Sequence, residues 1–103
     1  MVIIKDPLEF EWDKGNVTKN YDKHGVNERE SEEAFFDENR RTFKDRLHSN
    51  NEERFRVIGM TKSKRLLFVV FTIRKEKIRV ISARDVNRKE VKLYEEKINT
   101  TKI

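Results

Sequence analysis

The sequence predicts an α+β fold, in which an antiparallel sheet of about four strands carries two N-terminal helices and one C-terminal helix. The first observation behind this prediction is residues 65–74, RLLFVVFTIR, which are apolar at both parities and rich in Val, Ile and Phe. Because a strand alternates its side chains between two faces, this run needs cover on both and belongs at the centre of the sheet. The second observation is residues 78–84, a further strand-like run that follows after only Lys75-Glu76-Lys77. This linker is too short for a crossover helix, so the two strands should be antiparallel neighbours.

The segment before this hairpin begins with a strand and a short helix. Leu8–Trp12 alternates apolar and acidic residues, as a half-buried strand does. Asn16 stands where it could cap a helix over Val17–His24, and Gly25 suits the C-terminal end of that helix.

A second helix is predicted over about residues 28–37. Asn27 and Glu30 have the spacing of a capping box, which marks a helix start. The residues expected to face inward are Ala34, Phe35 and, as an open alternative, Phe36.

Two strands are predicted between these helices and the hairpin. Thr42–Lys44 reads as a short strand, and Asp45–Asn51 reads as a loop. Glu53–Met60 reads as the next strand, and the polar Thr61–Lys64 reads as the turn into the central strand.

A last helix follows the hairpin. Asp85 stands where its N-cap would be, and the helix should run from Val86 to about Ile98. Its apolar stripe at helical spacing consists of Val91, Tyr94 and Ile98. The tail Asn99–Ile103 is expected to be frayed.

Length and composition indicate one folded domain over residues 1–103, with a core over about residues 8–98. Hydrophobic residues make up 35% and charged residues 42%, which approaches the composition of disordered chains. Seven Phe, two Tyr and one Trp indicate instead a folded domain with a highly charged surface. Cys is absent, so disulfides are excluded. Because no apolar stretch is long enough to span a membrane and no signal-peptide pattern is present, a cytoplasmic location is expected.

Positive charge is concentrated in one part of the chain. The formal net charge is +5, and residues 62–92 hold eleven Lys and Arg against three Asp and Glu. The remainder holds thirteen basic and sixteen acidic residues. Such asymmetry indicates a surface for a polyanion, although a solvated charged face is an equally acceptable reading.

Several kinds of chemistry lack their motifs. The three glycines are isolated, so no phosphate-binding loop is present. The two histidines, His24 and His48, have no metal-ligand spacing. We therefore expect no metal and no cofactor.

The remaining polar residues suit RNA cleavage without a metal. That reaction needs proton transfer at the 2′-hydroxyl and the leaving oxygen, and cations around the phosphate. The residues that can move protons are Lys23, His24, His48, Glu53 and Tyr94. The residues that can hold phosphate are Arg54, Arg74, Arg79 and Arg84. Arg79 is the strongest candidate, because it interrupts an apolar strand.

Each candidate also has a structural interpretation. His24 could simply end the first helix, where a cation is favoured. Glu53 could form an ordinary ion pair, and Arg74 could protect a sheet edge. Trp12 could lie in the core or stack on a base, and Tyr94 lies on an apolar stripe that suits the core.

A set of short motifs resembles one family, the BrnT family of bacterial type II toxins, over roughly residues 8–95. These motifs are FEWD at 10–13, N-x-x-KHGV at 20–26, EAFFD at 33–37, HS at 48–49, ERF at 53–55, IG at 58–59, FT-x-R at 71–74, IRVISAR at 78–84 and the KE…Y run at 89–94. The resemblance implies a RelE-like fold and a ribonuclease activity that halts translation. It also implies an antitoxin of ribbon-helix-helix type, similar to BrnA, which forms a complex that binds operator DNA.

The resemblance assigns site residues by position. The active-site residues it implies are Lys23, His24, Glu53, Arg74, Arg79 and Arg84. To these we add as RNA-binding residues Trp12, Arg54, Lys75 and Lys77. Asn16 stands where many members carry a Lys, so any RNA contact of that Lys is missing here or is made by Lys14 or Lys19.

The sequence thus predicts a metal-independent endoribonuclease toxin whose phosphate clamp is Arg74, Arg79 and Arg84, beside the imidazole of the first helix. His24 or Glu53 would take the 2′-hydroxyl proton. The alternative is a basic module that binds nucleic acid or a protein without chemistry.

Overall fold

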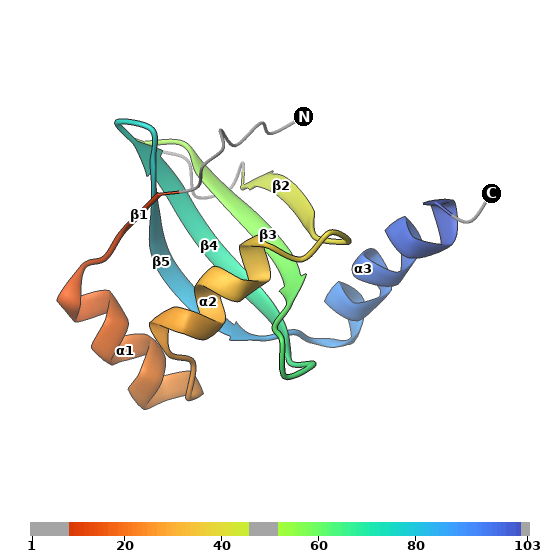
Figure 1. Ribbon diagram of the computed structural model, residues 1–103, viewed down its shortest axis with the longest axis horizontal. Coiled ribbons are helices and arrows are strands. Elements are labelled where there is room, and N and C mark those ends of the chain that lie inside the picture. Colours follow the sequence, from red (N-terminus) through yellow and green to blue (C-terminus); the bar gives the residue numbers. More distant parts are fainter. Residues whose placement is uncertain (1–8, 46–51, 102–103) are drawn as a thin grey trace.

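The computed structural model describes residues 9–45 and 52–101, with side chains up to Glu96. Figure 1 shows a twisted sheet with two helices on one side and a third helix that extends away from it. The elements are β1 (Phe10–Glu11), α1 (Lys14–His24), α2 (Glu28–Phe35), β2 (Arg41–Asp45), β3 (Arg54–Met60), β4 (Leu66–Arg74), β5 (Lys77–Asp85) and α3 (Arg88–Thr101).

The predicted α+β architecture is confirmed, with β4 in the middle of the sheet. The strand order is β1-β5-β4-β3-β2, so the sheet has five strands rather than about four. All neighbours are antiparallel except β1, which pairs in parallel with β5. The two-residue β1 is shorter than the predicted strand over residues 8–12, of which Leu8 lies outside the described residues.

The turn between β4 and β5 contains only two residues, because Arg74 pairs with Lys77. Lys75 and Glu76 have φ angles of 50° and 67°, in the left-handed region. Two left-handed central residues match the twist of a hairpin, although such positions favour Asn and Gly. The prediction of a tight antiparallel hairpin here is confirmed.

The start of α1 differs from the prediction. The N-cap is Asp13, whose Oδ1 accepts hydrogen bonds from the amides of Gly15 at 2.8 Å and Asn16 at 3.2 Å. Asn16 therefore lies inside the helix and donates its side-chain amide to the carbonyl of Val80 at 3.4 Å. The predicted end of the helix is confirmed, since Gly25 adopts a φ of 63°.

The capping box that begins α2 is confirmed, with Asn27 and Glu30 bonded reciprocally. The helix ends at Phe35, two residues before the predicted end. Ala34 and Phe35 are fully buried, whereas the side chain of Phe36 is 61% exposed.

The prediction that Asp85 caps the last helix is wrong. Asp85 is the final residue of β5, and α3 begins at Arg88 after a second capping box formed by Asn87 and Glu90. The helix continues to Thr101, so residues 99–101 belong to the helix where fraying was expected, and residues 102–103 lie outside the described part.

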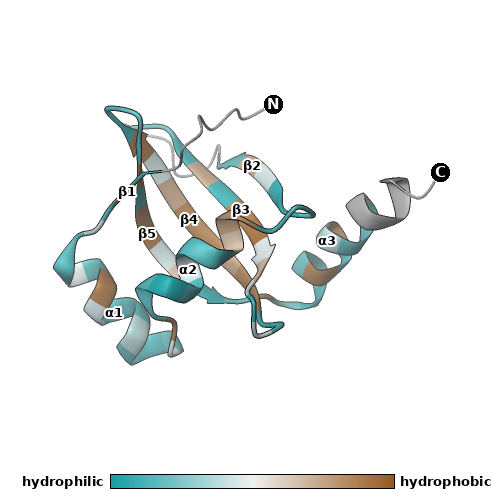
Figure 2. Ribbon diagram, in the orientation of Figure 1, coloured by the Kyte–Doolittle hydropathy of each residue, from teal (hydrophilic) through white to brown (hydrophobic). Residues whose placement is uncertain are grey.

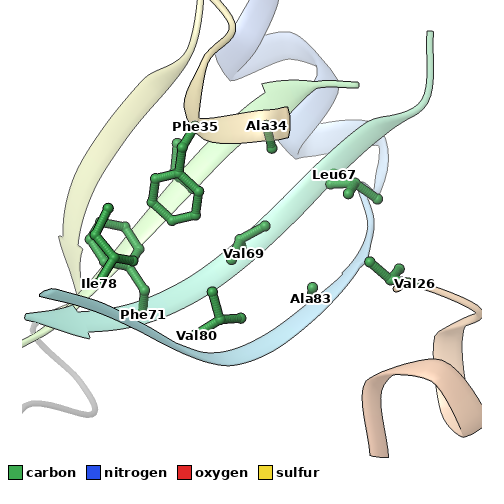
Figure 3. Close-up of a cluster of buried hydrophobic side chains, with 10 residues drawn as sticks. Val26, Ala34, Phe35, Leu67, Val69, Phe71, Ile78, Val80 and Ala83 are labelled. Atoms are coloured by element: carbon green, nitrogen blue, oxygen red, sulfur yellow. The ribbon is translucent and has the colours of Figure 1, made fainter. Parts of the chain in front are cut away.

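The main core lies between α2 and the sheet. Figure 3 shows Phe35 and Ala34 of α2 above the strand residues Val69, Phe71 and Val80. We call this side of the sheet the helix face. Phe35 and Phe71 meet edge to face at 4.9 Å between ring centroids, a favoured aromatic geometry.

A smaller core lies on the opposite side of the sheet, under α3. Its buried members are Ile58, Phe68 and Tyr94. Burial strongly raises the pKa of the Tyr94 hydroxyl, which donates a hydrogen bond to Asp37 at 2.5 Å. Of the two interpretations of Tyr94, the structure therefore shows the core residue.

The hydropathy of the ribbon reflects these two cores. In Figure 2 the brown residues are concentrated in the central strands, and the outer surfaces of α1 and α2 are teal. Within the described residues, no helix is long and apolar enough to cross a membrane.

Candidate active site

Six arginines lie on the side of the sheet opposite the helix face, which we call the arginine face: Arg41 in β2, which pairs with Ile58 of the smaller core, and five in β3, β4 and β5. Alternation along the strands places them there. In β3, Arg54 and Arg56 have the parity of Ile58 in the smaller core; in β4, Arg74 has the parity of Phe68. In β5, Arg79 pairs with Thr72 and Arg84 pairs with Phe68. Arg54 and Arg56 therefore lie on the face of β3 opposite to Phe55 and Val57, which belong to the main core.

Arg54, Arg74 and Arg79 gather at one end of this face, near the β4–β5 turn. Arg74 donates two hydrogen bonds to Glu52, from Nε at 2.6 Å and from Nη2 at 3.0 Å. These bonds from Arg74 lower the pKa of Glu52, and the charges of Arg79 and Arg54 lower it further. Glu52 is thus bound by Arg74, and the positive charges of Arg79 and Arg54 also act on it. We call Arg54, Arg74 and Arg79, with the carboxylates of Glu52, Glu11 and Asp13, the open-end cluster.

Arg79 is the most enclosed of the three predicted clamp arginines, with a side chain that is 22% exposed. Its Nη1 donates to Glu11 at 3.0 Å, and its Nη2 donates to Asp13 at 2.9 Å. Glu11 is brought there by the parallel pairing of β1 with β5, which places Glu11 beside Arg79. Because Asp13 also caps α1, the start of that helix and this guanidinium are fixed together.

Arg84 lies at the other end of the arginine face, beneath the start of α3. It donates two hydrogen bonds to Glu90, at 2.8 Å and 2.9 Å, and its guanidinium carbon lies 4.2 Å from the ring centroid of Phe68. Five residues of β5 separate Arg84 from Arg79, which is about 16 Å along a strand. The structure therefore places the three arginines of the predicted clamp on one face, but Arg84 apart from the other two.

Lys23 and His24 do not lie with the open-end cluster. They are exposed at the C-terminal end of α1. The carbonyl of His24 accepts a hydrogen bond from Arg65 at 2.8 Å, and Arg65 immediately precedes β4, whereas Arg74 ends that strand. These two arginines are nine residues apart, or about 30 Å along the strand.

Arg65 anchors this far end of the sheet. It bonds Asp85 through two nitrogens, Glu30 through a third contact, and the carbonyls of Gly25 and His24. The Arg65 bond is the main cause of a lowered pKa of Asp85, to which the nearby His24 also contributes. The structure thus brings His24 beside Asp85 rather than beside Arg79.

The other predicted site residues are spread over three places. Glu53 is exposed and accepts a hydrogen bond from Lys44 at 3.1 Å. Lys44 follows Phe43 in β2, and Phe43 belongs to the smaller core, so Lys44 lies on the helix face of the sheet. Trp12 packs against the main core and donates to Glu32 at 2.8 Å. Lys75 and Lys77 are exposed in and beside the hairpin turn next to Arg74.

Sequence reasoning missed the carboxylates of the open-end cluster, which are Glu11, Asp13 and Glu52. The available signal was the alternation in Phe10-Glu11-Trp12, which places Glu11 on the face opposite two aromatic rings. Pairing of this strand with Arg79 was not readable from local sequence, because the partners are 68 residues apart.

Two further candidates lie outside the described residues, namely His48 and Ser49. Within the described part of the chain, His, Asp and Glu side chains form no group of three that could hold a metal ion.

The fold and the open-end cluster define a small α+β protein with arginines gathered on one face of its sheet. A family model described as the ribonuclease toxin, BrnT, of type II toxin-antitoxin systems matches residues 12–90. The match covers most of the chain, and the chain therefore belongs to the BrnT family. As a member of this family it is a ribonuclease toxin, whose substrate is RNA and whose partner is an antitoxin.

The fold is also that of a solved relative. The crystal structure of the Brucella abortus ribonuclease toxin BrnT is similar, with a TM-score of 0.61 and 20% sequence identity, over 79% of this chain and 99% of that chain. No curated protein sequence matches the chain.

Proposed function

We propose that this chain is a metal-independent endoribonuclease toxin that binds the scissile phosphate of RNA at the open-end cluster. The observation that carries the proposal is that Arg54, Arg74 and Arg79 lie at one end of the arginine face, where Arg74 binds the carboxylate of Glu52 through two nitrogens. A carboxylate and a phosphate present similar oxygen pairs to a guanidinium, so Glu52 marks where a phosphate would bind.

The reaction we propose is attack of the 2′-oxygen on phosphorus. The O2′–P bond forms as the P–O5′ bond breaks, which leaves a 2′,3′-cyclic phosphate, and the departing O5′ takes a proton from solvent water to become the 5′-hydroxyl. Arg74 and Arg79 stabilise the charge that develops on the phosphate oxygens. A phosphate bound to Arg74 displaces Glu52, and the released carboxylate then lies beside the substrate, where it can accept the 2′-hydroxyl proton.

The sequence-based roles of Lys23, His24, Glu53 and Arg84 remain predictions of the same proposal. His24 lies at the opposite end of the sheet from the open-end cluster. Both could act on the same phosphodiester only if the substrate contacted the two ends at once. The variant His24→Ala therefore distinguishes the two arrangements. Cleavage that survives in His24→Ala but not in Arg79→Ala supports the open-end cluster, whereas equal loss supports the site predicted from sequence.

The central experiment is cleavage of a defined RNA by the purified protein in excess EDTA, with product ends identified by mass spectrometry. We expect cyclic-phosphate products, and we expect Arg79→Ala and Arg74→Ala to lose cleavage by about a hundredfold or more, as for loss of a charge-stabilising donor. Lys62→Ala, an exposed cation at the other end of β4, is the matched control. Intact RNA in EDTA, with cleavage restored by Mg²⁺, would reject the metal-free mechanism.

The antitoxin is proposed to be of ribbon-helix-helix type and to neutralise the toxin by covering the arginine face with acidic side chains. Complementary charge of this kind favours fast and specific association. Operator DNA would then be bound by the complex, through the antitoxin. If phosphate-mimicking anions such as heparin fail to compete with the antitoxin, this mode of neutralisation is wrong.

Tight RNA binding that weakens with salt but gives no product would instead indicate a binding module without catalysis.

A further inference from the structure

The smaller core under α3 contains a second group of cations and aromatic rings. The guanidinium of Arg84 lies 4.2 Å from the ring centroid of Phe68, and that of Arg56 lies 5.5 Å from the centroid of Phe43. Arg41 contacts the same ring of Phe43 at 4.9 Å. Guanidinium groups held against aromatic rings are also what proteins use to bind single-stranded nucleic acid.

Arg56 is incompletely satisfied in this position. Its Nε is buried and has no hydrogen-bond partner. A buried charged donor without an acceptor is costly, and native proteins rarely keep one without a reason. Among the described residues, the side chain therefore presents a donor that no acceptor satisfies.

Glu90 of α3 binds one arginine of this group. Its side chain is 11% exposed and makes a bidentate pair with Arg84. Burial raises the pKa of Glu90, but the hydrogen bonds from Arg84 and the amide of Asn87, with the charges of Arg84 and Arg56, lower that pKa by more and leave it below its ordinary value. Glu90 is thus held as a carboxylate by Arg84, as a bound phosphate would be, and the charge of Arg56 also acts on it.

We propose that Arg56 and Arg84, whose guanidinium groups are oriented by the rings of Phe43 and Phe68, form a second phosphate-binding subsite for single-stranded RNA, and that Glu90 binds Arg84 there in the free protein. The inference extends the proposed function, because the subsite lies on the same face as the open-end cluster. Arg84 is about 16 Å from Arg79 along β5, a distance that several nucleotides of an extended strand can bridge. Bound RNA would displace Glu90 and loosen the start of α3.

The experiment measures binding of a labelled 2′-O-methyl oligoribonucleotide by fluorescence anisotropy. This probe cannot be cleaved, because the attacking hydroxyl is blocked. In Glu90→Gln we expect affinity to rise about tenfold, which corresponds to about 1.4 kcal/mol, the low end for one charged hydrogen bond. Gln at this position of a capping box keeps the helix start, so the variant should remain folded.

The matched control is Glu95→Gln, which removes the same charge from an exposed position of the same helix. It should change affinity far less than Glu90→Gln. Adding Arg56→Gln to Glu90→Gln should remove the gain, as a double-mutant cycle would show for groups that act together. Equal effects of Glu90→Gln and Glu95→Gln would overturn the proposal.

A second measurement uses the unmodified chain, in case Glu90→Gln disturbs α3. The Nε–Hε resonances of Arg56 and Arg84 should shift together on addition of the oligonucleotide, and the absence of a shift at either would also overturn the proposal. Since the probe is not a substrate, these results are independent of whether the chain cleaves RNA without metal. Loss of cleavage with intact binding would count against the proposed function alone.

Discussion

Individual arginines of the arginine face form ion pairs with carboxylates. Arg74 binds Glu52, and Arg79 binds Glu11 and Asp13. The side chains of the Arg74–Glu52 pair are 47% and 38% exposed, so solvent screens the pair and it adds little to stability. Such pairs orient the guanidinium groups, and a phosphate can replace the carboxylate at little cost in folding free energy.

Gly59 shows how a residue without a side chain positions α2 on the sheet. A Cβ at Gly59 would lie 2.1 Å from the carbonyl oxygen of Ala34, which is backbone and cannot move aside. We expect Gly59→Ala to lower the free energy of unfolding by about 3 kcal/mol, at the upper end for overpacking, as measured by urea denaturation.

The control for this variant is Gly15→Ala. The nearest atom to a Cβ there is the Asp13 side-chain oxygen at 3.1 Å, at an exposed position. A change of less than about 1 kcal/mol is expected, because Ala also favours the helix. If the two variants were equally stable, the close approach of α2 to β3 would be incorrect.

At the scale of elements, α1 protects the part of β5 that β1 does not cover. The side-chain oxygen of the buried Asn20 accepts a hydrogen bond from the amide of Ala83 at 3.3 Å, and Asn16 donates to the carbonyl of Val80. Two side-chain amides thus satisfy backbone groups that would otherwise form an open sheet edge. Asn16 has this structural contact at the position where many family members carry a Lys.

Asn20→Ala tests this edge contact. Removal of the acceptor leaves the buried Ala83 amide unpaired, which should cost about 1–3 kcal/mol in the free energy of unfolding. Hydrogen exchange at the Ala83 amide should also be faster in the Asn20→Ala variant. Asn16→Ala should cost less, because its bond is 3.4 Å long and only partly buried; the reverse order of the two variants would contradict this account.

The β4–β5 turn is the second element with a specific prediction. Lys75 and Glu76 both adopt positive φ, which costs about 1 kcal/mol for each such residue. The double variant Lys75→Asn, Glu76→Gly should therefore raise the thermal midpoint of unfolding. A lowered midpoint, measured by circular dichroism, would show that the turn is not left-handed. Because Lys75 is a predicted RNA contact, Glu76→Gly alone serves as the control for binding.

At the scale of the whole molecule, the twisted sheet separates two kinds of surface. The helix face is closed by α2, whereas the arginine face carries α3 only near one end (Figure 1). Because six arginines lie on one side of the sheet, the electrostatic potential is more positive on that side than the net charge of the chain alone indicates.

RNA binding should accordingly weaken as salt concentration rises, by an amount that depends on the number of phosphate contacts. For three phosphate contacts from Arg54, Arg74 and Arg79, the logarithm of affinity should fall with that of salt concentration at a slope of about −2. Arg79→Gln should reduce the slope by about 0.7, the value of one contact to a single strand. Anisotropy titrations from low to moderate salt measure both; an unchanged slope in Arg79→Gln would remove this residue from the interface.

Local sequence determined the elements of this protein. Residues 65–74 form the central strand because their side chains are apolar at both parities, and Lys75-Glu76-Lys77 yields a hairpin because it is short. The cap at Asn27 was readable for the same reason, since a capping box lies within four residues. Motif resemblance also indicated the family, which the match over residues 12–90 established.

Only the tertiary structure decided which charged groups meet. Parallel pairing of β1 with β5 brought Glu11 and Asp13 to Arg79, and the length of β4 put His24, which contacts Arg65, at the opposite end of that strand from Arg74. Pairings of this kind depend on strand register and on the order of strands in the sheet. Both follow from burying the two cores of the whole chain, and no single segment contains that information.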